Sequence, residues 1–327
     1  MATARSKSFT FKLTPEQQGK LEEHLNGGNY LPIEVPHTRV AVDAEGCKIM
    51  LYKTGKCLVQ GGKASDWVQF TLEPLVLQEI VTGYDNVRNP EWFHPHMGVD
   101  ESGKGDFFGP MVISAVYSDE ELIHRFQEMG VKDSKKITSD RKALELARDL
   151  RGLLGDRFAS VVIGPRSYNR LYATMRSVNS LLAWGHARAI ENLLETVPGC
   201  PRAVSDQFGP KRQIEQALMK KGRAIELVQR PKAEEDPAVA AASILARAGF
   251  LDAVRRMEKQ YDQEFPKGAS QRVLNAAREM VDKLGADTLL VTAKCHFKTT
   301  DKVLYSLGLD RGILGQDGQV VSKTRAS

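Results

Sequence analysis

The residues best suited to chemistry lie in one short segment, Gly98–Pro110, with the sequence GVDESGKGDFFGP. Two adjacent carboxylates, Asp100 and Glu101, are bracketed by glycines and followed by Lys104. The pattern G-x-x-x-x-G-K occurs in phosphate-binding loops, but such a loop needs Ser or Thr after the lysine to ligate magnesium, and Gly105 stands there. Two carboxylates inside the loop would also repel phosphates. We therefore set the phosphate-loop interpretation aside.

A strand that runs into a glycine-rich turn explains the segment better. Adjacent residues of a strand point to opposite faces, so Asp100 and Glu101 converge on one site only if the backbone bends just after them. Ser102, Gly103 and Gly105 permit that bend. Two close carboxylates repel each other and need a cation to stay ionised together, so the segment indicates a site for a hard divalent metal. A solvated acidic pair at a strand end is the alternative.

The elements that position this segment alternate between strands and helices. Strands are predicted at 111–116, 157–163, 203–206 and 224–229, and helices at 119–129, 139–154, 177–196, 237–262 and 270–283. Pro237 suits the first position of its helix. Such alternation is typical of an α/β domain with a central mixed sheet, which we assign to residues 98–313.

Residues 1–85 are predicted to form a separate, small α+β unit. A strand at 8–13 precedes a helix that begins at Thr14-Pro15. An antiparallel meander follows, and a second helix from Ser65 must be kinked or split by Pro74. This order leaves one face of the sheet without helices, which favours a binding or docking role for that face. The meander strands are predicted at 38–42, 47–52 and 57–60.

Two further segments have no expected regular structure. Residues 86–97 are interpreted as a linker because they carry Asn and two prolines. Residues 314–327 lack apolar periodicity and are predicted to be a loose C-terminal tail.

Composition places broad limits on the class of protein. With 327 residues the chain should hold about two domains. It has 46 Lys and Arg against 41 Asp and Glu, a net charge of +5, which is compatible with a polyanionic partner without demonstrating one. The four cysteines have no CxxC spacing, so a zinc site or a redox pair is not expected. No long apolar run occurs, and we expect a cytoplasmic protein without a membrane association.

The motif DESGKGDFFGP closely resembles the signature of the type 2 ribonucleases H, and more narrowly that of ribonuclease HIII. Further blocks resemble the family in the expected order, so that the likeness covers residues 98–305. In ribonuclease HIII a domain resembling one repeat of the TATA-box-binding protein precedes the catalytic domain, and residues 1–85 are similar to it. The blocks are KDSKK at 132–136, SD at 205–206, KAEED at 232–236, AAASILAR at 240–247, FPKGAS at 265–270 and KCHFKT at 294–299.

The resemblance implies an endonuclease with four carboxylates and Mg²⁺ or Mn²⁺, which hydrolyses the RNA strand of RNA/DNA hybrids and leaves 3′-hydroxyl and 5′-phosphate ends. Asp100, Glu101 and Asp206 map directly onto metal ligands of the family. The family's acid after Lys-Ala corresponds to Glu234, but its spacing to Ala-Ser-Ile is one residue shorter than in ribonuclease HII. Asp236 is the rival: it either caps the helix that follows or reaches the metal from the helix start.

The resemblance also implies substrate contacts. Distinguishing RNA from DNA requires reading the 2′-hydroxyl, and the glycines Gly103 and Gly105 would let the backbone approach a sugar closely. Lys104 would meet a phosphate. Other lysines would add contacts to the hybrid backbone, which supply affinity that is independent of sequence and sensitive to salt. These lysines are Lys135, Lys136, Lys267 and Lys298.

Histidines are given structural interpretations first, because an isolated histidine is more often structural than catalytic. His296 either assists proton transfer or serves the structure. His186 lies on a predicted helix and is treated in the same way. His94 and His96 flank Pro95, and we assign them to the linker.

Two alternatives to hybrid hydrolysis remain open. One is the incision of single ribonucleotides embedded in DNA, as in ribonuclease HII, and the other is a hybrid-binding protein that has lost catalysis. The partner in each case is a nucleic acid duplex, and a monomer is expected. The patterns do not choose between Mg²⁺ and Mn²⁺, since both accept carboxylate oxygens.

Overall fold

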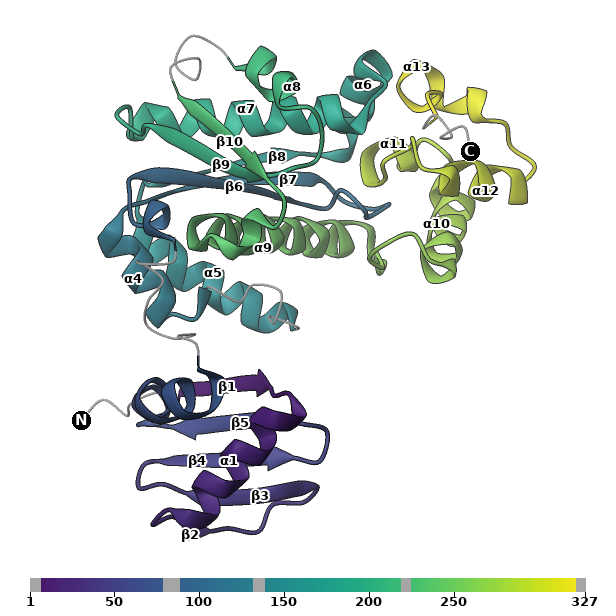
Figure 1. The fold of residues 1–327 in the computed structure, drawn as a ribbon. Coiled ribbons are helices and arrows are strands. Elements are labelled where there is room, and N and C mark those ends of the chain that lie inside the picture. Colours follow the sequence, from purple (N-terminus) through teal and green to yellow (C-terminus); the bar gives the residue numbers. More distant parts are fainter. Residues whose placement is uncertain (1–6, 79–88, 132–138, 219–224, 322–327) are drawn as a thin grey trace. The chain divides into compact units, whose positions relative to one another are not determined.

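The chain forms two units in a computed structural model that describes residues 7–78, 89–131, 139–218 and 225–321. The first unit comprises Met1–Pro90 and the second Glu91–Ser327 (Figure 1). Their boundary falls within the segment 86–97 that the sequence analysis interprets as a linker. Each unit has its own hydrophobic core, so each is described separately.

The N-terminal unit is a five-stranded antiparallel sheet in the order β1-β5-β4-β3-β2. Inward side chains of its strands form a single core with Leu21 and Leu25 of the first helix and Val68 and Leu72 of the last helical segment. The described helices therefore cover one face of the sheet. The elements are β1 (Lys7–Lys12), α1 (Pro15–Gly27), β2 (Leu31–Pro32), β3 (Thr38–Asp43), β4 (Cys47–Tyr52), β5 (Lys56–Gly61), α2 (Ala64–Trp67) and η1 (Val68–Leu77).

Local sequence explains both helical regions of this unit. Helix α1 begins with a capping box, in which the Thr14 hydroxyl accepts a hydrogen bond from the Gln17 backbone and the Gln17 side chain accepts one from the Thr14 backbone. Pro74 lies inside η1, a π-helical segment, where the missing amide of proline favours wider hydrogen bonding such as Gln78 N to Glu73 O at 2.7 Å. The helical segment continues through Pro74 to Leu77, so it is not split there, and the predicted kink stays a prediction.

The second unit contains a mixed five-stranded sheet in the order β10-β9-β6-β7-β8. The central strand β6 runs parallel to β9 and antiparallel to β7. The α/β class with a central mixed sheet is therefore confirmed. The strands are β6 (His96–Ser102), β7 (Met111–Ser118), β8 (Phe158–Ile163), β9 (Arg202–Asp206) and β10 (Glu226–Arg230).

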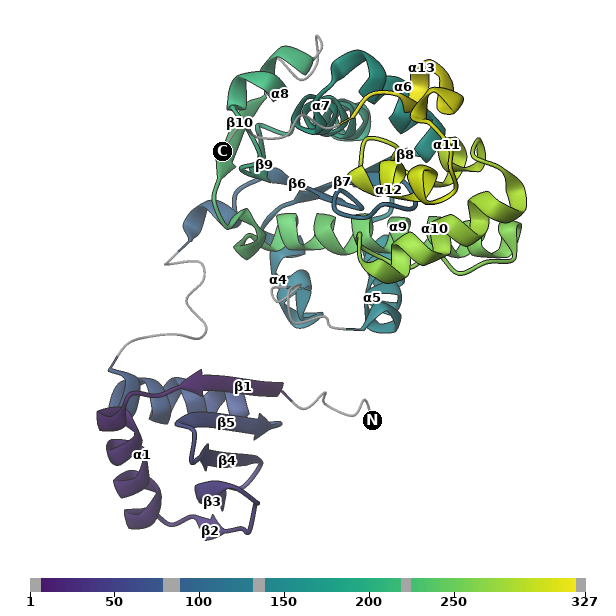
Figure 2. The ribbon, with the colours of Figure 1, turned by 90° about the vertical axis from the view of Figure 1, so that its right-hand side faces the viewer.

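Helices cover both faces of this sheet: α6, α7 and α8 lie on one face, and α4, α5 and α9 on the other (Figures 1 and 2). Helix α9 is long and apolar enough to cross a membrane, but 72% of its most apolar window is buried inside the protein, as expected of a core helix. The bounds are α4 (Glu120–Glu128), α5 (Asp140–Leu154), α6 (Pro165–Met175), α7 (Val178–Thr196), α8 (Lys211–Ala217) and α9 (Pro237–Tyr261).

The C-terminal helices pack around a third cluster of apolar residues that includes Phe107 and Phe108. The prediction of a loose tail from residue 314 is wrong for its described part, because α13 continues the fold. Leu314 is buried, and Gly318 accepts a hydrogen bond from Arg311 at 2.9 Å. Backbone contacts anchor this segment, which apolar periodicity does not reveal. The elements are α10 (Gln271–Leu284), α11 (Thr288–Thr292), α12 (Lys298–Ser306), η6 (Arg311–Leu314) and α13 (Gly315–Gly318).

Lys294 ties these helices to the loop after β6. Its side chain is fully buried, and its Nζ donates to the carbonyl oxygens of Asp106 at 2.8 Å, Phe108 at 3.4 Å and Gly109 at 2.7 Å. Burial lowers the pKa of Lys294 to about 7, a cost of desolvation that the three carbonyl contacts offset. The lysine therefore fixes the path of the loop through its hydrogen bonds.

We expect Lys294→Met to lower the free energy of unfolding by about 2–3 kcal/mol, because the buried carbonyls of the loop lose their donor. Urea denaturation followed by circular dichroism measures the change. Lys302→Met is the matched control, since Lys302 is an exposed lysine of α12. Equal midpoints for the two variants would contradict the role of Lys294.

Candidate active site

Strand β6 carries the acidic pair and packs directly against α9. Along one face of β6, Asp100 accepts a hydrogen bond from Ser243 of α9. On the same face, a Cβ on Gly98 would lie 2.2 Å from the backbone of Ala238 and of Val239. Only glycine at position 98 allows this close approach. The helix is thereby held against the strand two residues before Asp100.

Glu101 points to the opposite face of the sheet. His186 of α7 lies with its Nε2 3.1 Å from Glu101 Oε2, and Lys104 Nζ lies 3.5 Å from Glu101 Oε1. Strand β6 continues through Ser102 and the chain bends within the predicted segment Ser102 to Gly105, but Asp100 and Glu101 still point to opposite faces of the sheet. The chain turns at Gly103, whose φ is +87° and where a Cβ would lie 2.3 Å from the carbonyl oxygen of Pro110.

The two carboxyl groups differ in their electrostatics. Burial raises the pKa of Asp100 to about 7, and the charge of Glu101 contributes to the rise. Burial would also raise the pKa of Glu101, but the hydrogen bond from His186 and the charges of His186 and Lys104 outweigh it, so that its pKa is lowered. The site thus holds one ionised carboxylate with cationic neighbours and one carboxyl group that resists ionisation.

Asp206 ends the strand next to β6. Val99 of β6 and Ser205 of β9 are register partners in the parallel pair. Asp100 and Asp206 are the next residues on the two strands, so they occupy equivalent positions. The Asp206 carboxylate accepts a hydrogen bond from the backbone amide of Ala233 at 3.4 Å. Ala233 opens the 3₁₀ turn η5 (Ala233–Glu235), and this contact brings the turn to the acidic end of the sheet.

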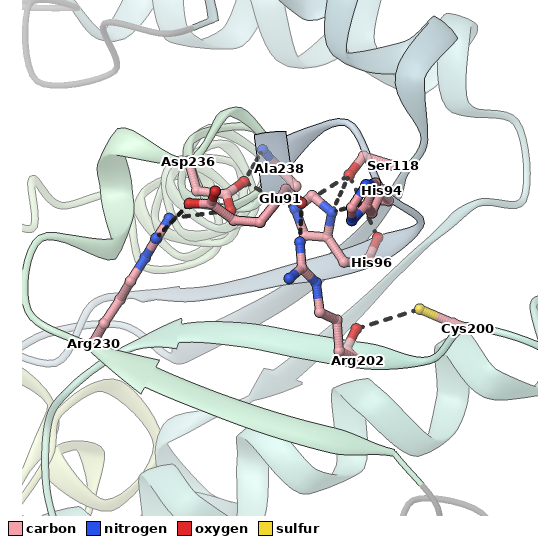
Figure 3. A network of polar contacts seen from close by, with 9 residues as sticks. All are labelled: Glu91, His94, His96, Ser118, Cys200, Arg202, Arg230, Asp236 and Ala238. Carbon is pink, nitrogen blue, oxygen red and sulfur yellow. Dashed lines mark hydrogen bonds and ion pairs between the residues drawn. The ribbon is translucent and has the colours of Figure 1, made fainter. Parts of the chain in front are cut away.

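The rival acids for the fourth position have different surroundings. Asp236 is fully buried and caps α9 by accepting from Ala238 N at 3.0 Å. Its other contacts are to His96 at 3.1 Å and Arg230 at 3.4 Å (Figure 3). Glu234 is the central residue of η5 and directly follows the residue that contacts Asp206, whereas Glu235 is exposed.

One histidine prediction needs correction, and one histidine contact was not foreseen. His96 is fully buried within β6 and contacts Asp236, so it does not belong to the linker. His186 lies on a helix as predicted and contacts the Glu101 carboxylate, a contact that was not predicted. The neighbouring Gly185 contained a usable signal, since a Cβ there would lie 2.6 Å from Ile113 of β7. A glycine in a helix can mark close approach to a sheet, and here it brings His186 to the strands.

The structural interpretation of His296 agrees with its surroundings. The side chain is buried and its ring stacks on Tyr172 with centroids 4.4 Å apart. Burial lowers the pKa of His296 to about 3, with further lowering from Lys294 and Arg311. The ring therefore stays neutral near pH 7.

The lysines predicted to bind substrate have separate surroundings. Lys104 lies beside Glu101 and 5.7 Å from the centre of the Phe208 ring. Lys267 pairs with Asp140 at 2.6 Å, so a phosphate would compete with that carboxylate, and Lys298 is exposed at the start of α12. The remaining two, Lys135 and Lys136, lie outside the described residues.

The donor set suits a hard divalent cation. In the described part of the chain, no three acidic, histidine or cysteine side chains already converge on one point as a metal centre. Carboxylate oxygens are nevertheless the ligands that Mg²⁺ and Mn²⁺ prefer. A cation beside Asp100 would also offset the burial and the repulsion that raise its pKa. The residues present therefore fit a divalent metal.

Comparisons with known proteins agree with this arrangement. The sequence model of the Ribonuclease HII family matches residues 97–300. The chain is 38% identical to ribonuclease HIII of Chlamydia pneumoniae over 90% of this chain and 97% of that protein. It is 39% identical to ribonuclease HIII of Protochlamydia amoebophila, over 84% and 90% respectively. The crystal structure of Bst-RNase HIII in complex with Mn²⁺ is similar at a TM-score of 0.63 and 25% identity, covering 92% of this chain and 99% of that one.

We expect Gly98→Ala to destabilise the second unit by about 2 kcal/mol or more, because the new methyl group overlaps the backbone of α9 and forces the helix from β6. Thermal and urea unfolding measure the loss. Gly105→Ala is the matched control, as nothing lies within 4 Å of a Cβ at that position. A Gly98→Ala protein as stable as this control would refute the close packing of α9 on β6.

Proposed function

The chain belongs to the ribonuclease HIII group of the ribonuclease HII family, and we propose that it hydrolyses the RNA strand of RNA/DNA hybrids. The reaction is a divalent-metal-dependent endonucleolytic cleavage that leaves 3′-hydroxyl and 5′-phosphate ends. The observation that carries this proposal is the position of Asp100, Glu101 and Asp206 at the ends of two neighbouring parallel strands.

Glu234 is our choice for the fourth carboxylate. It follows Ala233, whose amide contacts Asp206, and so belongs to the turn at the acidic edge of the sheet. Both oxygens of Asp236 have partners inside the protein, His96 and Ala238 for one and Arg230 for the other. Asp236 would have to give up these buried contacts to ligate a metal. The proposed ligands are therefore Asp100, Glu101, Asp206 and Glu234.

These carboxylates would hold a divalent ion, which would supply activation of the attacking water and stabilisation of the leaving 3′ oxygen. The protein's own contribution is placement. Ser243 orients Asp100 through a hydrogen bond, and His186 orients Glu101. Lys104 lies beside Glu101 with a partly exposed ammonium group, from which it can also contact a phosphate of the substrate.

Selection of RNA is assigned to the turn after β6. The 2′-hydroxyl distinguishes RNA from DNA, and a backbone that reads it must approach the sugar closely. Gly105 has open space around its Cα, which is compatible with such an approach, while Gly103 holds the turn's left-handed conformation. Lys267 and Lys298 remain proposals for contacts to the hybrid backbone, as do Lys135 and Lys136.

We propose that the helix-free face of the N-terminal sheet is a second binding surface for the duplex. Residues of β4 and β5 alternate, and Cys47, Ile49 and Leu51 belong to the core under the helices. Lys48 therefore faces the other side, as does Lys56 by the same alternation in β5, and both are exposed. The similarity of this unit to a TATA-box-binding-protein repeat stays a prediction.

Three finer points are also proposals. The metal is Mg²⁺ or Mn²⁺, and the similarity to a structure containing Mn²⁺ supports divalent-metal use without choosing between them. We propose that the enzyme acts as a monomer. A cytoplasmic location stays a prediction.

Removal of one proposed ligand should abolish most turnover while sparing substrate binding. We expect Asp100→Asn and Glu234→Gln each to lower kcat on a continuous hybrid by roughly 100-fold or more, because charge stabilisation of the transition state is lost. KM should change little. Steady-state cleavage of a labelled hybrid measures both constants, and Glu235→Gln is the matched control.

The same assay tests the alternatives. A duplex with a single embedded ribonucleotide serves as the second substrate, and preferential cutting of it by the wild type would favour ribonuclease HII-like incision. Full activity of Asp100→Asn would remove the proposed mechanism, and wild-type binding without cleavage would identify a catalytically silent hybrid-binding protein.

Charge reversal on the sheet face should weaken binding. We expect Lys48→Glu combined with Lys56→Glu to raise KM for the hybrid severalfold and to reduce the salt dependence of binding by about one unit of slope per lysine, at unchanged kcat. Fluorescence anisotropy over a series of salt concentrations measures this. Lys20→Glu on α1 is the control, since Lys20 lies on the helix side and pairs with Glu16. If the double variant and the Lys20→Glu control bind the hybrid with the same affinity, this face of the sheet does not bind the duplex.

A further inference from the structure

Asp236 is the most enclosed acid near the site. It is fully buried, as is its partner His96. The His96 ring has acceptors at both nitrogens, with the His94 carbonyl oxygen 2.7 Å from Nδ1 and Asp236 Oδ1 3.1 Å from Nε2. Removing a carboxylate from water is costly, so a buried carboxylate needs close polar partners.

Arg230 completes the surroundings of Asp236. Arg230, at the end of β10, lies 3.4 Å from Asp236 Oδ2 and 3.3 Å from Glu91 Oε1 (Figure 3). Arg202 of β9 donates to the backbone oxygen of Glu91. The network thus joins the start of the second unit, the starts of β6 and β9, the end of β10 and the start of α9.

The same network determines where Glu234 lies. The turn η5 is only three residues long. At its first residue, Ala233 N contacts Asp206, and immediately after its last residue the Asp236 amide donates to Ala233 O at 2.9 Å. Glu234 lies between these two anchors, so movement of Asp236 would displace it.

Strand β6 provides the reference for this placement. His96, Gly98 and Asp100 are every second residue of β6 and therefore lie on one face. His96 contacts Asp236, the cap of α9. Gly98 lies against the backbone of Ala238, and Asp100 contacts Ser243. Asp236 therefore sets the register of the helix start relative to the strand that carries the catalytic pair.

We propose that Asp236 is a positioning residue, which through His96 and Arg230 holds the η5 turn so that Glu234 meets the metal site beside Asp206. This inference rests on the proposed function, because it assigns Glu234 rather than Asp236 to the metal. Asp236 itself contacts neither metal nor substrate. Residues that orient metal ligands commonly change metal affinity or activity about 10–100-fold when replaced.

The test measures Mn²⁺ binding to the full-length protein by calorimetry, alongside kcat and KM for a continuous hybrid. We expect Asp236→Asn to weaken Mn²⁺ binding about tenfold and to lower kcat at fixed Mn²⁺, with recovery as Mn²⁺ is raised and with KM for the hybrid unchanged. Glu235→Gln, one position away and exposed, should match the wild type in both measurements.

Arg230→Gln serves as the second variant, since the loss of a buried carboxylate can reduce folding. Its side chain is partly exposed, so we expect this variant to fold with a wild-type circular dichroism spectrum. Its Mn²⁺ affinity and its kcat at fixed Mn²⁺ should fall, but less than in Asp236→Asn. Unaltered Mn²⁺ affinity in folded Asp236→Asn or Arg230→Gln overturns the proposal.

Two further outcomes distinguish this proposal from the function on which it rests. Loss of Mn²⁺ binding in Asp236→Asn as complete as in Asp100→Asn, without recovery at high Mn²⁺, makes Asp236 a ligand and overturns the positioning role. Failure of the wild type to cut hybrids overturns the proposed function, while the Mn²⁺ affinities of the variants still support or refute the placement of Glu234.

Discussion

The close packing of α9 on β6 is the constraint on which the active site depends. The helix approaches the strand at Gly98, where its backbone occupies the space of a side chain. This approach brings Ser243 to Asp100 and the cap Asp236 to His96. A larger residue at position 98 would separate α9 from the strand that carries Asp100 and Glu101, so a single missing methyl group keeps Ser243 and the cap Asp236 in place beside that strand.

Burial explains why the acids differ in their partners. A carboxylate inside a protein needs compensation, and each acid of the site obtains it from a different element. Glu101 has His186 and Lys104, whereas Asp236 has His96 and Arg230. Asp100 has the Ser243 hydroxyl and a pKa raised by burial. The modest net charge of +5 is consistent with this arrangement, because a basic side chain paired with an internal carboxylate adds no net charge to attract a polyanion.

Much of the fold was predictable because its signals are local. The capping box at Thr14 and the alternation of strands and helices both depend on residues near one another in the chain. The contacts of His96 and His186 could not be predicted in this way, since their partners lie 140 and 85 positions away in the sequence. Asp236 was left as a cap or a ligand, and its buried partners favour the cap. Its contact with Arg230, only six positions away, depends on the path of η5, which the spacing of residues does not specify.

The cationic partners of Glu101 also bear on how the site tolerates the absence of a metal. Lys104 and His186 already balance Glu101, while Asp100 can be neutralised by taking up a proton near pH 7. Two fixed charges would otherwise repel within the same strand end. A divalent ion held by Asp100 would replace that proton, and Glu101 would then face both the ion and Lys104. The ammonium group of Lys104 is partly exposed beside Glu101, so the same side chain that balances Glu101 is also accessible to a phosphate.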